Sequence, residues 1–123
     1  MKNYNLNLKT DIKKRSYLFS LKIIAFVETL EKNQINSILV NQLIRAATSI
    51  GANIIEAQAS SSKKDFINFY HHALKSANET KYWLCLLRDS KKGDYNKTQL
   101  LLNEAIELAN MLASSILTMK GKK

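Results

Sequence analysis

Adjacent histidines, His71 and His72, are the side chains in this sequence that most directly suggest metal binding or acid–base catalysis. Consecutive side chains of a helix point about 100° apart, so the pair does not readily hold one metal ion. Di-iron helical bundles need a Glu-x-x-His motif on facing helices. The segments that begin at Glu56 and Glu79 have no histidine at the required position. We therefore predict no metal site and no cofactor.

Nucleophilic and phosphate-binding chemistry is equally weakly supported. Cys85 lies among Leu84, Leu86 and Leu87, which is typical of a half-buried structural thiol. Neither Arg45 nor Arg88 is followed closely by the histidine that helical-bundle ribonucleases carry, and the sequence has no glycine-rich phosphate loop. The sequence thus predicts a protein without catalytic residues, and an enzyme, whether a hydrolase or a metal enzyme, remains only a third hypothesis.

Charge gives a clearer indication of the partner. Nineteen Lys and Arg residues against ten Asp and Glu give a formal net charge of +9. Such an excess makes a polyanion, either nucleic acid or an anionic membrane, the first partner to consider. The positive charge is concentrated in residues 1–33 and 63–97, whereas residues 34–62 are neutral. The side chains predicted to contact nucleic-acid phosphates are Lys13, Lys14, Arg15, Lys64, Lys75, Lys91 and Lys92.

Long helices must position these side chains, because the 123 residues include no proline and only three glycines. Apolar residues at helical spacing predict helices over about 11–32, 37–58, 63–88 and 95–119. Ser62, with Asp65 in the first turn, is a capping signal for the third helix. The fold expected is all-α, a single antiparallel up-down four-helix bundle over residues 1–123, with flexible basic ends at about 1–10 and 120–123.

The apolar stretch within the first predicted helix is too short and too often interrupted to span a bilayer. We therefore predict no membrane partner. A single cysteine fits a reducing compartment, so the expected location is the cytoplasm.

Two polar stripes also run beside the apolar faces of the middle helices. Gln42, Arg45, Ser49, Asn53 and Glu56 share one face of the second helix, and Asp65, His72, Ser76, Glu79 and Trp83 share one face of the third. Opposite charges such as Arg45 and Glu79 are suited to pairing across the helices. The stripes predict either a seam that fixes helix register or a subunit interface, or else a groove for a ligand.

A separate outer line on the third helix joins basic residues to an aromatic one. It consists of Lys64, Asn68, His71, Lys75, Asn78 and Tyr82. Basic side chains with an interleaved aromatic ring are suited to phosphate contact and to stacking on an exposed base. The same spacing of lysines is also common on any solvated helix face.

Three motifs on these helices resemble a known family. They are QLIRAATSIGANIIE over residues 42–56, KDFINF over 64–69 and ALKSANET over 73–80. Together they resemble the four-helix-bundle family of 23S rRNA intervening-sequence proteins. The chain departs from the family pattern at Gly51, where proline is frequent, and at Ala57 and Lys75, where glycine is common. The motif residues that the resemblance assigns to a functional surface or an interface are Arg45, Ser49, Asn53, Glu56, Ser76 and Glu79.

The resemblance implies a small non-catalytic bacterial protein that assembles into a ring-shaped homopentamer, and it favours RNA over DNA. One branch of the family resembles the accessory protein of diversity-generating retroelements, which binds nucleic acid and a reverse transcriptase. The first hypothesis is therefore a homo-oligomer that binds structured RNA. The alternative is a protein-interaction scaffold or accessory subunit for a polymerase or reverse transcriptase. Trp83, which lies off the main apolar face, is predicted to contribute to a subunit contact.

Overall fold

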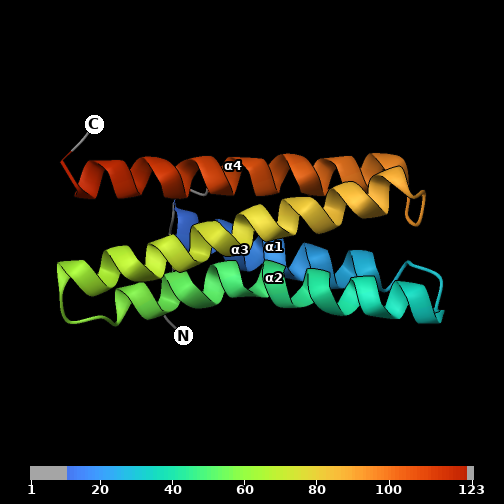
Figure 1. The fold of residues 1–123 in the computed structure, drawn as a ribbon, viewed down its shortest axis with the longest axis horizontal. Helices are drawn as coiled ribbons and strands as arrows, with labels where there is room; N and C mark the ends of the chain where they lie inside the picture. The colour runs from blue at the N-terminus through green and yellow to red at the C-terminus, as the bar shows by residue number, and fades with distance from the viewer. Residues whose placement is uncertain (1–10, 122–123) are drawn as a thin grey trace.

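Four α-helices account for nearly all of residues 11–121, which are the residues that the computed structural model describes. The helices are α1 (Ile12–Val27), α2 (Gln34–Gln58), α3 (Lys63–Asp89) and α4 (Tyr95–Met119), and no strand occurs in this range. The colours of Figure 1 show that each helix runs opposite to the one before it. The predicted all-α, up-down bundle is confirmed. Residues 1–10 and 122–123, which make up most of the predicted basic ends, lie outside the described range.

Each helix begins after a side chain that accepts a hydrogen bond from a backbone N–H of its first turn. An N-cap of this kind satisfies one of the donors that a helix start leaves without a partner. The predicted Ser62 cap is confirmed, because its Oγ accepts from the backbone N–H of Asp65 at 3.1 Å. The caps of the four helices are Asp11, Asn33, Ser62 and Asp94.

The connection between α1 and α2 differs from the prediction. Helix α1 ends at Val27 rather than near residue 32, and α2 begins at Gln34 rather than at residue 37. The Thr29 hydroxyl donates to the Phe26 carbonyl at 2.6 Å, which closes the last turn. The chain then bends so that Leu30, only 6% exposed, packs in the core outside any helix. Because Leu30 continues the apolar spacing of α1, the sequence pattern predicts one more helical turn than the structure has.

The core lies along the bundle axis and is made of aliphatic and aromatic side chains from all four helices. Helix α1 contributes Phe19, Ile23 and Phe26. Ala73 and Ala77 of α3 are fully buried, and such small side chains let neighbouring helices approach closely. Helix α1 packs on α2 and α4, and α3 packs on the same two helices.

The apolar stretch predicted within the first helix is only partly buried in α1. Leu21 and Ile24 are 47% and 43% exposed, and Ala25 is exposed as well. The residues that α1 buries are Ser16, Phe19, Ile23 and Phe26, and the side chains on its outer face remain at the surface.

Helices α2 and α4 are long and apolar enough to cross a membrane by length and composition. In the bundle, their apolar residues supply much of the core, including Leu43, Ile50 and Ile54 from α2 and Leu108 and Leu112 from α4. Core helices of a bundle have this same composition, because one side of each helix is buried.

Candidate nucleic-acid interface

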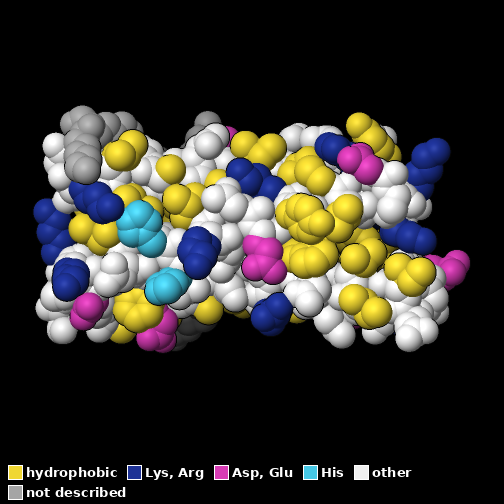
Figure 2. All heavy atoms as spheres, in the orientation of Figure 1, with side chains coloured by type: hydrophobic (Ala, Val, Ile, Leu, Met, Phe, Trp, Pro, Cys, Tyr) yellow, Lys and Arg dark blue, Asp and Glu magenta, His cyan; other side chains and the backbone are white. Residues whose placement is uncertain are grey.

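The outer line predicted on α3 lies on the surface. Lys64, Asn68, Lys75, Asn78 and Tyr82 are exposed, and His71 is half-buried. Figure 2 shows Lys and His side chains gathered over the half of this face that holds the start of α3. The largest gathering of hydrophobic side chains lies over the other half, which also carries Lys or Arg side chains toward its far end. We name these the basic half and the apolar half, after the side chains that predominate on each.

The start of α3 meets the end of α4 at one end of the bundle, and lysines from both helices converge there. Lys63, Lys64, His71 and Lys120 line a shallow hollow together with Ile67 and Asn68. Lysine ammonium groups and an amide are the donors that bind phosphate oxygens. Lys120 was predicted only as part of a flexible end, but it is the C-cap residue of α4 and belongs to this group.

Lys91 and Lys92 lie at the opposite end of the bundle, in the turn between α3 and α4. Because α3 extends over 27 residues, a rise of about 1.5 Å per residue separates the two basic ends by roughly 40 Å. Lys91 has a φ of 59°, which places a lysine in the left-handed region of the backbone map. A ligand that contacts both ends must therefore be an extended polyanion.

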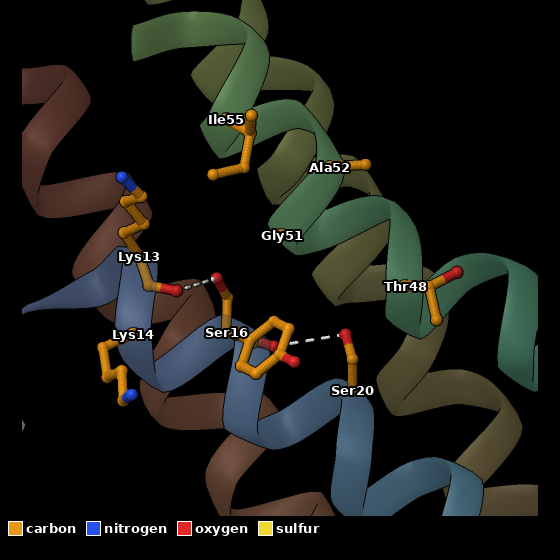
Figure 3. Close-up of a pocket in the computed structure, with 9 residues that line it drawn as sticks. Lys13, Lys14, Ser16, Ser20, Thr48, Gly51, Ala52 and Ile55 are labelled. Atoms are coloured by element: carbon orange, nitrogen blue, oxygen red, sulfur yellow. Dashed lines mark hydrogen bonds between the residues drawn. The ribbon is translucent and has the colours of Figure 1, made fainter. Parts of the chain in front are cut away.

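Lys13 and Lys14 belong to a third place, a groove between α1 and α2. Figure 3 shows this groove, with the two lysines at the start of α1 and Thr48, Gly51, Ala52 and Ile55 on the facing side of α2. Its volume is about 440 Å³, and most of its lining is apolar.

Two α1 serines at the floor of this groove donate their hydroxyl protons to backbone carbonyls. Ser16 bonds to the carbonyl of Lys13 at 3.0 Å, and Ser20 bonds to that of Ser16 at 3.2 Å. At the tightest point, a Cβ on Gly51 would lie 3.3 Å from the Ser16 Oγ. Gly51 therefore lets α1 and α2 pack closely, and the groove is suited to an apolar group with cations at one end.

Arg15, the remaining predicted phosphate contact, is paired with a carboxylate of α4. Its Nη2 and Nε donate to Glu104 at 2.6 and 3.1 Å, and the two side chains are only 17% and 24% exposed. The hydrogen bond to Glu104 raises the pKa of the Arg15 guanidinium, although burial opposes this shift. Arg15 therefore ties α1 to α4, and its charge is already balanced.

The two polar stripes meet between α2 and α3. Asn53 lines a shallow hollow with Phe69, His72, Lys75, Ser76 and Glu79. The suggested pairing of Arg45 with Glu79 does not form. The Arg45 guanidinium donates to Gln42 of its own helix at 2.6 Å, and Glu79 accepts from the Trp83 indole N–H at 3.0 Å.

The other members of the stripe on α2 are satisfied locally. Ser49 donates to the Arg45 carbonyl at 2.7 Å, the Asn53 amide donates to the Ser49 carbonyl at 2.8 Å, and Glu56 is exposed. The two polar stripes therefore lie side by side, and no ion pair joins their described residues. Lys75 and Glu79 are the exposed lysine and carboxylate of the hollow.

Residues 11–121 contain no cluster of three or more His, Cys, Asp or Glu side chains that could hold a metal ion. Cys85 is half-buried, as expected from its neighbours. The chemistry that the described residues do offer is anion binding, by lysines at both ends of α3 and at the start of α1.

Sequence reasoning missed the convergence of Lys63 and Lys120, although an up-down topology places the start of the third helix beside the end of the fourth. It also missed the groove between α1 and α2 beside Lys13 and Lys14, since the shape of this groove depends on how the two helices pack.

Comparison with known proteins identifies the family of the chain and a similar fold. The pattern of the 23S rRNA-intervening sequence protein family matches residues 9–114. The chain belongs to this family. A crystal structure of a protein of unknown function from the S23 ribosomal protein family of Bacteroides thetaiotaomicron is similar, with a TM-score of 0.80 and 37% identity. The similarity covers 85% of this chain and 97% of the other. None of the curated proteins matches this 23S rRNA-intervening sequence protein.

Proposed function

We propose that this 23S rRNA-intervening sequence protein is a non-catalytic homo-oligomer that binds structured RNA through its basic surface. The observation that carries the proposal is the separation of the basic groups along α3, from Lys64 at its start to Lys91 and Lys92 just beyond its end. Several weak phosphate contacts at fixed positions on a rigid helix suit an extended polyanion better than a small anion. The family description, which names an intervening sequence of 23S rRNA, supports RNA as that polyanion.

Assembly into a ring, with a pentamer as the expected form, would multiply the net charge of +9 per chain. Identical sites on one particle raise the effective affinity without new contacts. The apolar half of the face in Figure 2 supports a contact between proteins. Ile35 and Ile38, at the start of α2, are also largely exposed, at 59% and 57%. A polymerase as the partner for such a surface remains the alternative.

The salt dependence of binding tests the proposal. Removing one lysine that binds a phosphate should lower the slope of log affinity against log salt by about 1. We expect the Lys64→Gln/Lys75→Gln variant to weaken binding of a fluorescent rRNA hairpin and to flatten this slope by about 2 per occupied subunit. The matched control is Lys22→Gln, which removes an exposed lysine from α1 instead. Binding that is absent at low salt, or equally steep in both variants, would contradict the proposal.

A further inference from the structure

Tyr82 is an aromatic side chain that the bundle leaves at the surface. It is 58% exposed, and it is the last residue of the outer line on α3. Its ring meets the ring of Trp83 edge to face, with centroids 5.0 Å apart and an interplanar angle of 75°. A contact of this geometry covers at most one face of the Tyr82 ring. A flat apolar surface of this kind is therefore open to a second ring.

The neighbouring Trp83 is itself held in place. Its indole N–H donates to a carboxylate oxygen of Glu79, one helical turn earlier, at 3.0 Å. Fixing Trp83 also limits the orientations of the Tyr82 ring that packs against it. An aromatic surface that is ordered before binding loses less conformational entropy when a ligand stacks on it.

Tyr82 lies on the same face of α3 as two lysines of the basic half. Lys75 lies two helical turns earlier on the same face, about 10 Å along the axis. Lys64 lies on that face too, roughly 27 Å away. A strand whose phosphates lie along these lysines would reach Tyr82 where the basic half ends and the apolar half begins. Asn78, exposed between Lys75 and Tyr82, adds an amide that can donate to or accept from a base edge.

We propose that Tyr82 is a stacking platform for an unpaired base of RNA whose adjoining phosphates lie along Lys64 and Lys75. The preferred ligand is then a duplex with a single-stranded extension rather than a blunt duplex. Proteins read single-stranded RNA by stacking its splayed bases on aromatic side chains, whereas duplex bases are already stacked on one another. This inference rests on the proposed RNA-binding function and specifies the ligand of the same face.

Trp83 makes the site directly observable, because it is the one tryptophan in the chain. The experiment compares a blunt RNA hairpin with the same hairpin carrying a short single-stranded purine extension. Binding is followed by fluorescence anisotropy, and tryptophan emission is recorded in the same titration. We expect the extended hairpin to bind about tenfold more tightly, as stacking of one base allows, and to quench the tryptophan emission.

Three variants assign the effect. Tyr82→Leu keeps an apolar side chain but removes the ring, and it should abolish the preference and the quenching. Tyr82→Phe should retain both. Tyr95→Leu is the matched control, because Tyr95 is 60% exposed but lies at the start of α4, away from the outer line. It should retain both as well.

The outcomes separate this inference from the proposed function. Failure of the wild-type protein to bind either hairpin would overturn the proposed function, and the inference with it. Equal binding of both hairpins would overturn the stacking inference alone. So would an equal weakening for both hairpins in Tyr82→Leu. A change in particle mass in that variant, with the preference for the extended hairpin intact, would assign Tyr82 to a protein contact instead.

Discussion

The pair formed by Arg15 and Glu104 offers a quantitative test, because sequence reasoning treated Arg15 as a phosphate contact. Hydrogen bonds to charged groups contribute about 1.5–3 kcal/mol, whereas fully exposed ion pairs contribute about 0.2–1 kcal/mol. With exposed fractions of 17% and 24% and two hydrogen bonds at 2.6 and 3.1 Å, this pair falls between these limits. We expect a coupling energy of about 1–2 kcal/mol.

The assay is a double-mutant cycle with Arg15→Gln, Glu104→Gln and the double variant, measured by denaturant unfolding. Each single variant breaks the ion pair but keeps the other charge, so the double variant should be more stable than the sum of the two single effects predicts. The control cycle uses Arg88 and Asp89, an adjacent pair in which the Asp89 side chain is 66% exposed. Its coupling should be much smaller, because water screens the two charges.

The same double variant tests the functional assignment. Replacing both Arg15 and Glu104 leaves the net charge unchanged, so RNA affinity and its salt dependence should stay at wild-type values. A phosphate contact by Arg15 would instead appear as a slope reduced by about 1. That result, or a coupling below about 0.3 kcal/mol, would refute the view that Arg15 ties α1 to α4.

Three shorter predictions concern stability and assembly. Gly93→Ala should lower the unfolding free energy by about 1–2 kcal/mol in thermal melts, since a new Cβ would lie 2.9 Å from Leu30 and 3.0 Å from Phe26, both buried; an unchanged or higher melting temperature would contradict this packing. Ser62→Ala should cost about 1 kcal/mol by removing the cap of α3, and Ser62→Asp should restore it. Trp83→Glu should break a homo-oligomer into smaller species, and an unchanged mass in light scattering would rule out Trp83 as a central contact.

Local features of the bundle could be predicted from the sequence, and features that depend on distant neighbours could not. The start of α3 was predicted because Ser62 and its partner N–H lie in one turn. The end of α1 was missed because Leu30 is buried by the folded bundle and not by a helix. The partner of Arg15 lies 89 residues away in the chain, and no local spacing indicates it.

In the candidate site, too, local features could be predicted from the sequence and features that depend on helix packing could not. The outer line on α3 lies at the surface as predicted, because the spacing of residues within one helix determines which side chains share a face. The sequence predicts a polar stripe on each of the two middle helices. It does not predict the hollow that brings Asn53 together with Ser76 and Glu79, since this depends on how α2 and α3 pack. The predicted ion pair of Arg45 failed because a nearer amide on its own helix satisfies the guanidinium.

Lys91 adopts a left-handed backbone conformation, which lowers the stability of the fold, while its side chain adds a positive charge at the far end of the bundle. A residue with a side chain is about 1 kcal/mol less stable than glycine in this conformation. Lys91→Gly should therefore raise the melting temperature while it weakens RNA binding. A substitution that improves the fold and impairs the ligand surface would identify the turn as a place where the molecule gives up stability to present a cation.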